Sequence, residues 1–305
     1  MTPPRITVVG SSNFDLFSRP PRFPKPGETL MGGEFRTDFG GKGANQAVTA
    51  ARLGAQVTMV TRIGRDVFGQ RMLENYTEQG INTRYVFVDE MRASGVADIW
   101  VDDGGQNVII ISPGANMALT PEDAQRAADA IQSAAVVVCQ LEIPIATVTE
   151  AFRIARAAGV RTILNTAPAA PIPDELIALS DILSPNETET ELLTGQPVDS
   201  LDDVAEAARS LLTRGAQTVV VTLGKRGALL VQRDAVHHVP PTPVQAVDTT
   251  GAGDAFIGAL AVFLGEGHSL IQAVEWANIV AGMSVTRRGT QASLPYRAEI
   301  AAKLA

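Results

Sequence analysis

A glycine-led segment that ends in an acidic residue is the part of this sequence best suited to chemistry. Asp248-Thr249-Thr250-Gly251-Ala252-Gly253-Asp254 precedes an apolar stretch whose residues 256, 259, 260, 263 and 264 fit one face of a helix. The first turn of a helix presents unpaired N–H groups and the positive end of the helix dipole, and glycines let an anion approach the backbone closely. The segment therefore predicts a phosphate site.

Asp254 needs a specific role in such a site, because a carboxylate repels a bound phosphate. Accepting a proton from an attacking hydroxyl group is a role that an aspartate performs in phosphoryl transfer. The alternative is an aspartate that only caps the helix. Competing nucleotide motifs are excluded, since Gly258 comes too late for G-x-G-x-x-G after Gly251 and Gly253, and no G-x-x-x-x-G-K-[ST] P-loop is present.

A second group of polar residues is spread along the chain but is predicted to meet at one edge of a sheet. Asn13 and Asp15 alternate after the first strand, Lys42 and Asn45 stand at the start of a helix, and Glu142 follows the strand 136–141. Each alone is more typical of a turn or a solvated side chain. Together, these amides, carboxylates and ammonium group favour a pocket for the vicinal hydroxyls of a polyol.

Two further turns have residues suited to a nucleotide. Asn186-Glu187-Thr188-Glu189 follows a short strand, where a carboxylate could hold Mg²⁺ through water, although Asn186 could simply cap a helix. Thr222-Leu223-Gly224-Lys225-Arg226-Gly227 joins two strands. Thr222, Gly224 and Gly227 could hold nucleotide phosphates there, or the segment could be a plain turn.

The elements that must position these residues alternate along most of the chain. Apolar runs predict buried strands at 6–9, 57–63, 136–141, 162–164, 182–183 and 218–223, and helical patterns lie between them, as at 121–132, 147–158 and 201–214. Gly54, Gly80, Gly159 and Gly215 fall where helices should end. This alternation predicts an α/β fold, a doubly wound and mostly parallel sheet with helices on both faces.

Two segments break the alternation. The strand-like piece 28–36 has no helix after it, and 95–101 and 107–112 flank Asp103-Gly104-Gly105, which is typical of a β-hairpin. We interpret them as a small β lid, formed by insertions at about 16–39 and 95–114 in a single domain spanning 1–305. The alternative is that they are ordinary edge strands.

The composition limits the class of protein. The chain has 305 residues, 45% of them hydrophobic and 19% charged, with a formal net charge of −8, so we expect a soluble protein without a basic surface for nucleic acid or membranes. The single cysteine, Cys139, permits no internal disulfide. We find no signal peptide or apolar run long enough to cross a bilayer, and therefore expect a cytoplasmic protein.

The two most distinctive segments resemble the signatures of the ribokinase (PfkB-type) carbohydrate kinase family. They are Gly40-Gly41-Lys42-Gly43-Ala44-Asn45-Gln46-Ala47 and Asp248-Thr249-Thr250-Gly251-Ala252-Gly253-Asp254-Ala255-Phe256, and the likeness extends from Val8 to about Pro295. The resemblance implies a Rossmann-like fold with a β-sheet lid. It also implies MgATP-dependent phosphorylation of the 5-hydroxyl of a ribose-like sugar, and a homodimer formed through paired lids.

The resemblance also implies roles for individual residues. Asp254 would be the general base, and Gly251, Ala252 and Gly253 would form an anion hole. The sugar would be held by Asn13, Asp15, Gly41, Lys42, Asn45 and Glu142. Mg²⁺ and ATP would be held by Asn186, Glu189, Thr222, Gly224, Gly227, Gly253 and Asn278. A potassium ion would be held, largely by backbone carbonyls, in loops containing Asp248, Thr250, Ser284, Arg287, Gly289 and Ser293.

Other functions stay open at this stage. Another sugar kinase of the family, acting on deoxyribose or a ketohexose, would share these motifs, and a non-catalytic sugar- or nucleotide-binding regulator would share the fold. Asn278 stands where some family members have His, and Phe14 is bulkier than the residue expected between Asn13 and Asp15. A nucleoside kinase is disfavoured by Lys42 and Glu142, and a dinucleotide-dependent oxidoreductase by the missing fingerprint.

Overall fold

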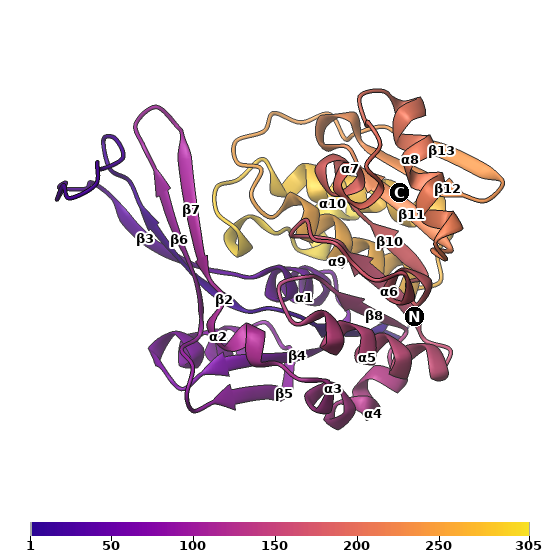
Figure 1. The fold of residues 1–305 in the computed structure, drawn as a ribbon, viewed down its shortest axis with the longest axis horizontal. Coiled ribbons are helices and arrows are strands. Elements are labelled where there is room, and N and C mark those ends of the chain that lie inside the picture. Colours follow the sequence, from indigo (N-terminus) through magenta and orange to yellow (C-terminus); the bar gives the residue numbers. More distant parts are fainter. Residues whose placement is uncertain (1, 305) are drawn as a thin grey trace.

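A nine-stranded sheet forms the centre of the molecule in a computed structural model that describes residues 2–304 (Figure 1). Its strands pair in parallel except at the β12 and β13 edge, where the chain returns in two antiparallel steps. In spatial order they are β13 (Ala235–Val239), β12 (Ala228–Gln232), β11 (Thr218–Thr222), β10 (Ile182–Ser184), β9 (Arg161–Asn165), β8 (Val136–Cys139), β1 (Arg5–Val9), β4 (Gln56–Gly64) and β5 (Asn82–Asp89).

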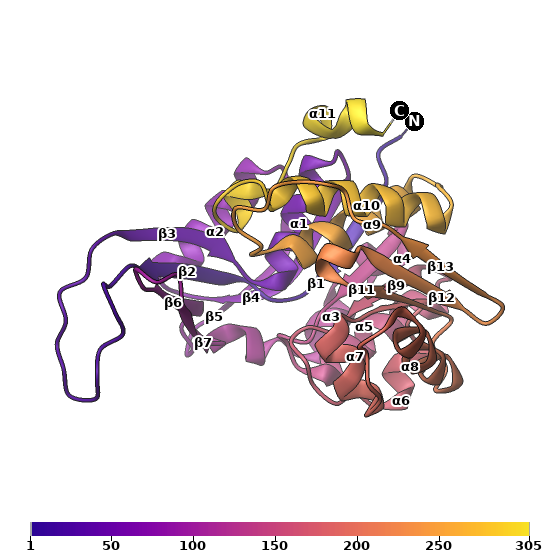
Figure 2. The same ribbon diagram turned by 90° about the horizontal axis from the view of Figure 1, so that it is seen from above.

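Helices cover both faces of this sheet, as the alternation of apolar runs predicts. One face is covered by α1 (Lys42–Arg52), α2 (Val67–Glu78), α9 (Ala252–Gly265) and α10 (Leu270–Ser284). The other is covered by α3 (Pro121–Arg126), α4 (Ala128–Gln132), α5 (Ile145–Ala157), α6 (Asp174–Ala178), α7 (Glu187–Thr194) and α8 (Leu201–Thr213). The short α11 (Arg297–Ile300) lies near the C-terminus (Figure 2). None of the helices described between residues 2 and 304 has the length and apolarity to cross a bilayer.

A separate small sheet stands beside this body. Its order is β3 (Phe35–Gly40), β2 (Asn13–Ser18), β6 (Gly95–Val101) and β7 (Asn107–Ser112). The predicted hairpin is confirmed in β6 and β7, which pair antiparallel, whereas β2 and β6 pair in parallel. Figures 1 and 2 show the sheet projecting from the body, with the β2–β3 connection extending furthest away.

Three local predictions were wrong in detail. The strand expected at 28–36 lies at Phe35–Gly40, since the preceding segment contains Pro24, Pro26, Gly27 and the pair Gly32-Gly33, which do not favour a ladder. The helix expected over 121–132 breaks at Ala127, whose N–H is shared between the carbonyls of Asp123 and Ala124. Helix α9 is buried on every side from Asp254 to Leu264, not on one face, because it packs against α1, α10 and the sheet together.

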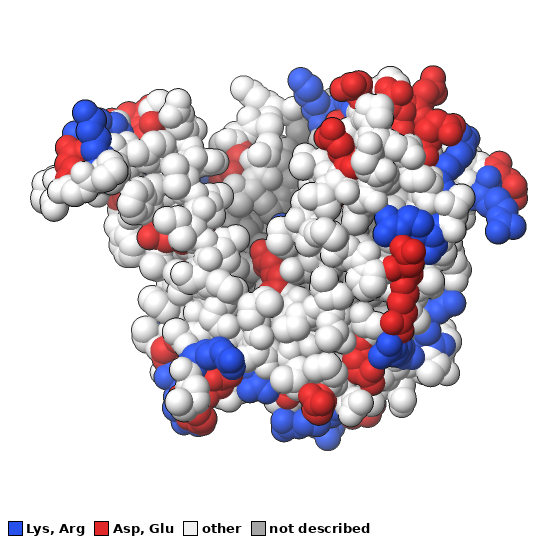
Figure 3. Space-filling model, in the orientation of Figure 1, with Lys and Arg blue, Asp and Glu red and all other residues white. Residues whose placement is uncertain are grey.

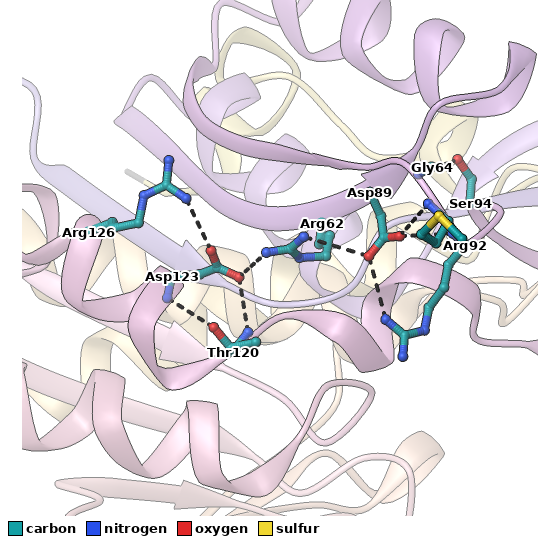
Figure 4. A network of polar contacts seen from close by, with 9 residues as sticks. Arg62, Gly64, Asp89, Arg92, Ser94, Thr120, Asp123 and Arg126 are labelled. Carbon is teal, nitrogen blue, oxygen red and sulfur yellow. Dashed lines mark hydrogen bonds and ion pairs between the residues drawn. The ribbon is translucent and has the colours of Figure 1, made fainter.

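A polar network ties the body to the start of the small sheet (Figure 4). The Arg62 guanidinium on β4 pairs with Asp123 on α3 at 2.6 Å and with Asp89 at the end of β5 at 3.6 Å. The Ser94 hydroxyl, next to the first residue of β6, accepts a hydrogen bond from the Gly64 N–H at 2.9 Å. These contacts hold the connection into the β6–β7 hairpin, so the small sheet has a defined base.

Candidate active site

The N-termini of α1 and α9 meet at the carboxyl ends of the central strands. Gly41 precedes α1 with a φ of 86°, and Gly251 precedes α9 with a φ of 76°, a region of backbone conformation that favours glycine. A Cβ atom at Gly41 would lie 2.7 Å from the Asn13 nitrogen. Gly41 thus allows α1 to start directly against the segment that carries Asn13 and Asp15.

Asp254 lies in the first turn of α9, and its carboxylate is buried between α9 and α1. Its Oδ2 accepts a hydrogen bond from Asn45 Nδ2 at 2.8 Å, and its Oδ1 accepts one from Gln46 Nε2 at 3.0 Å. Burial raises the pKa of Asp254, while Lys42 and the two amides oppose that increase. A desolvated carboxylate with a raised pKa is a stronger proton acceptor than an exposed one.

Lys42 is the cation shared by the acidic groups around it. Burial alone would lower the pKa of Lys42, but Asp254, Glu142 and Glu189 together raise it, so the side chain stays an ammonium ion. The Glu142 carboxylate accepts hydrogen bonds from the Lys42 N–H at 3.0 Å and from the Ser11 hydroxyl at 2.5 Å. The structure therefore joins Lys42 and Glu142 at one strand edge, as expected.

Asn13 and Asp15 extend this polar group onto the small sheet, because both lie in β2. Asn13 Oδ1 accepts a hydrogen bond from Asn116 Nδ2 at 2.7 Å, and Asp15 Oδ2 accepts a longer one from the Thr290 hydroxyl at 3.4 Å. Burial and the nearby Asp38 raise the pKa of Asp15 to about 7, and Glu142 and Asp254 contribute to the increase. A cleft separates the small sheet from the body (Figure 3).

A cavity of about 600 Å³ lies on the other side of the α9 N-terminus. Ala252 and Gly253 line it, whereas Asp254, the next residue in the first turn of α9, contacts Asn45 and Gln46. Its apolar wall includes Val244, Phe256 and Val285. The predicted nucleotide residues among its lining are Asn186, Thr222, Gly224, Gly227, Gly253 and Asn278. Asn278 Nδ2 donates to the Pro240 carbonyl at 3.2 Å, which fixes the amide at the cavity wall.

Glu189 differs from the other predicted nucleotide residues, since it is buried beside the cavity and does not line it. Its carboxylate forms a capping box with Asn186 and accepts a hydrogen bond from the Thr166 hydroxyl at 3.0 Å. Burial raises the pKa of Glu189, whereas these hydrogen bonds and Lys42 lower it. Glu189 therefore contributes negative charge close to Lys42, and Asn186 is the member of the pair that faces the cavity.

Among the residues expected to hold a potassium ion, the Asp248 side chain contacts other members of the set, whereas the side chains of Arg287, Ser284 and Ser293 contact groups outside it. Asp248 accepts hydrogen bonds from the N–H groups of Thr250 at 3.0 Å and Gly289 at 3.1 Å, which join two loops. Partial burial would raise the pKa of Asp248, but the bonds from Thr250 and Gly289 lower it. The Arg287 guanidinium instead pairs with Glu299. The Ser284 and Ser293 hydroxyls bond the carbonyls of Ala281 and Thr290 at 2.8 and 2.9 Å.

Several residues of the site were missed from the sequence. Gln46 bonds Asp254 directly and stands next to Asn45 in the quoted glycine-rich segment, so its position was a usable signal. Thr290 and Asn116 contact Asp15 and Asn13, but they lie far from them in the chain. No local pattern in the sequence points to these two contacts.

The fold and this arrangement of carboxylate, glycine-led helix and polar pocket place the chain among the carbohydrate kinases. The model of the pfkB family of carbohydrate kinases matches residues 3–297, and the chain belongs to that family. It is a phosphotransferase with an alcohol group as acceptor.

Several named kinases match almost the whole chain. The chain is 45% identical to a ribokinase from Mus musculus, over 97% of this chain and 93% of that protein. It is 44% identical to a deoxyribokinase from Salmonella typhi, over 95% of each. The structure of an Arabidopsis thaliana ribokinase complexed with ribose and ATP is similar at a TM-score of 0.95, with 35% identity and 99% of each chain covered.

Proposed function

We propose that this protein transfers the γ-phosphoryl group of ATP to the 5-hydroxyl of D-ribose, giving ribose 5-phosphate and ADP. The position of Asp254 carries the proposal. Its buried carboxylate lies in the first turn of α9, between the polar pocket of Asn13, Asp15, Lys42, Asn45 and Glu142 and the cavity lined by Ala252 and Gly253. The identity to ribokinases along the whole chain supports ribose as the acceptor.

The proposed reaction is a single displacement. Asp254 accepts the proton of the sugar hydroxyl as that oxygen bonds to the γ-phosphorus, and the bond from the γ-phosphorus to the bridging oxygen breaks, so that ADP leaves. The N–H groups of Gly251, Ala252 and Gly253 stabilise the charge on the transferring group from the α9 N-terminus. Lys42 offsets the negative charge that gathers around it.

We infer that Mg²⁺ and a monovalent cation assist this reaction. Asn186 lines the cavity, and its Nδ2 donates to the Glu189 carboxylate behind it at 2.9 Å; an amide oxygen and a carboxylate are groups that suit a hydrated Mg²⁺, which would neutralise phosphate charge. Asp248 and Gly289 join two loops, and backbone carbonyl oxygens of such loops would be ligands that suit K⁺. Bound there, K⁺ would fix the backbone that precedes the Gly251–Gly253 anion hole.

We also infer that the small sheet acts as a lid and joins two copies of the chain. Closure over the sugar would exclude water and limit idle hydrolysis of ATP. Val108, Ile109, Ile110 and Ile111 are all exposed on the edge strand β7, an apolar surface that a second copy could cover. The use of ATP supports a location in the cytoplasm.

A 2-deoxyribose acceptor is the second candidate, because the deoxyribokinase is nearly as similar to this chain as the ribokinase. An assay of ADP release across ribose, 2-deoxyribose, fructose and a nucleoside, each at limiting concentration with and without K⁺, separates these functions. We expect the highest kcat/KM with ribose and an increase on adding K⁺. Ribose and ATP binding without ADP release would instead support a regulator.

A further inference from the structure

The carboxylate of Asp254 is the end point of two chains of buried amide side chains. In one, Asn75 Nδ2 donates to Gln291 Oε1 at 2.9 Å, and Gln291 Nε2 donates to Asn45 Oδ1 at 3.2 Å. Asn45 then donates to Asp254 Oδ2. In the other, Gln140 Nε2 donates to Gln46 Oε1 at 2.6 Å, and Gln46 donates to Asp254 Oδ1.

The carboxylate itself dictates the orientation of every amide in these chains. An ionised carboxylate only accepts hydrogen bonds, so Asn45 must turn its NH₂ group towards Asp254 and its carbonyl oxygen away. That oxygen then requires a donor, which obliges Gln291 to present its own NH₂ group. The side-chain oxygen of Gln291 then requires a donor in turn, and Asn75 supplies it with its NH₂ group.

In the second chain, this orientation leaves the side-chain oxygen of Gln140 without a protein partner among the described residues. Gln46 Nε2 also donates to Asn165 Oδ1 at 3.1 Å, so Gln46 cannot turn its amide round. Gln140 must therefore direct its NH₂ group to Gln46, and its Oε1 has no hydrogen-bond partner within residues 2–304.

The outer members of the chains are held by the fold and do not depend on a bound ligand. Gln291 lies in a short 3₁₀ turn whose backbone is fixed by Arg52, since Arg52 Nη1 donates to the carbonyls of Gln291 at 2.6 Å and Leu294 at 2.8 Å. Asn75 lies inside α2, and Gln140 directly follows β8. All five amide side chains are buried, so water does not compete for their hydrogen bonds: Asn45, Gln46, Asn75, Gln140 and Gln291.

We propose that Gln291 and Gln140 are positioning residues that hold the NH₂ groups of Asn45 and Gln46 on the two oxygens of Asp254, and so set its orientation and basicity. The inference rests on the proposed function, in which Asp254 is the base. With both chains intact, one lone pair of each oxygen is occupied by the protein, and the carboxylate cannot rotate away from the sugar pocket.

The charged groups near Asp254 are the same in wild type and in a Gln291→Met variant, which serves as the test. Lys42 on α1 faces it as a cation, and Glu142 after β8, Asp15 on β2 and Glu189 on α7 face it as acidic groups. Gln291→Met changes none of these charges and keeps the backbone carbonyl that Arg52 binds. The substitution removes only the donor to Asn45 and the acceptor for Asn75, after which Asn45 is free to turn its oxygen towards Asp254.

The test is the pH profile of kcat/KM for ribose in wild type and Gln291→Met. We expect the acid limb to move up by about one pH unit, the scale for weakening a hydrogen bond to a charged group, with a roughly tenfold loss below the limb and recovery at high pH. Thr147→Val is the matched control, because it removes a buried 2.7 Å bond to the Leu119 carbonyl that belongs to neither amide chain. Its acid limb should not move.

A double-mutant cycle shows whether Gln291 acts through Asn45. In an Asn45→Ala background, Gln291→Met should change kcat/KM less than about twofold, since the group that it positions is already gone. An unmoved acid limb, or an equal loss at all pH values and in both backgrounds, would overturn the inference.

A measurement that needs no turnover tests this inference independently of the proposed function. We compare the Tm of a protein that keeps Asp254 with the Tm of its Asp254→Asn variant. The difference between the two, measured as a function of pH, reports the titration of Asp254 in the folded state. We expect that titration to lie at higher pH in the Gln291→Met background. A protein that phosphorylates no sugar but shows this shift contradicts the proposed function alone, whereas sugar phosphorylation without the shift contradicts the role of Gln291.

Discussion

Asp254 combines properties that conflict in an ordinary side chain: it is buried, it is charged, and it lies where a phosphate is expected. Burial disfavours the charged form, while Lys42, Asn45 and Gln46 favour it. The balance leaves a carboxylate whose pKa is raised but which has hydrogen bonds on both oxygens. This is the environment that a general base requires, because neither a fully stabilised nor a neutral carboxyl group accepts a proton well.

Replacing Asp254 by Asn removes the proposed base and keeps the shape of the side chain. We expect kcat to fall by roughly 10²–10⁴-fold, the usual contribution of a general base. Stopped assays of ADP release measure the loss. Calorimetric titration with ribose and with ATP is the control, and binding should persist. Near-normal turnover with intact binding would contradict the assignment of Asp254.

Asp15 should make the stability of the unliganded protein depend on pH. Its pKa is about 7 in the folded state and near 3.8 in the unfolded chain, so the folded state holds the proton more tightly between these values. Stability from this group is therefore present at low pH and is lost as the pH rises from about 4 to 7, by up to about 1.4 kcal/mol per pH unit.

Asp15→Asn should flatten this dependence. Thermal unfolding between pH 5 and pH 8 is the measurement, and the decrease in Tm with rising pH should be smaller in the variant than in wild type. The same slope in both proteins would mean that Asp15 titrates as it does in the unfolded chain.

At the level of elements, the contact between α1 and α9 brings Asp254 to the two amides that bond it. Asn45 and Gln46 lie on α1, and Asp254 lies on α9, so the distance between the helices sets both hydrogen bonds. Gly258 allows this close approach. A Cβ atom there would lie 2.6 Å from Thr49 Cβ and 2.7 Å from the Gln46 carbonyl oxygen.

Gly258→Ala should push the helices apart, with a loss of stability of about 1–3 kcal/mol and a lower kcat. Urea unfolding and ADP-release assays measure these effects. Gly253→Ala on the same helix is the stability control, because its Cβ would meet nothing within 4 Å. The control should keep or raise the stability, since alanine favours helix by about 1 kcal/mol over glycine. Equal destabilisation of both variants would argue against the packing explanation.

At the level of the whole molecule, each of the two sheets contributes different residues to the proposed reaction. The large sheet and its helices carry Lys42, Glu142 and Asp254, while the small sheet carries Asn13 and Asp15 on β2. Movement of the small sheet would therefore open or complete the sugar pocket. The exposed isoleucines of β7 lie on its free edge, where pairing with a second copy would also limit that movement.

Ile110→Glu should disrupt the proposed pairing of lids. We expect light scattering to give the mass of a dimer for wild type and of a monomer for the variant, because a charge in a covered apolar surface is costly. Val236→Glu, on the exposed edge strand β13 of the large sheet, is the control and should leave the mass unchanged. A monomeric wild type, or a dimeric Ile110→Glu variant, would contradict a dimer through the lid.

Local patterns in the sequence were sufficient to predict the sheet, the β6–β7 hairpin, the glycine-led start of α9 and the family. Each depends on residues close in the chain, such as Gly251 to Asp254, or on the alternation of apolar runs. Strands and helix ends form from such local patterns, so they can be predicted without knowing the tertiary contacts. That Lys42 and Glu142 lie together was also predictable, because the carboxyl ends of parallel strands converge at one edge.

Only the tertiary structure decided how Asp254 is held. Its contacts with Asn45 and Gln46 cross more than 200 positions of the chain, and Gln291 reaches Asn45 across 246. No periodicity records such contacts, since the orientation of each amide is set by the atom it meets after folding. Burial of α9 on every side likewise depends on how α1 and α10 pack, and that burial turns an aspartate at a helix start into a carboxylate with a raised pKa.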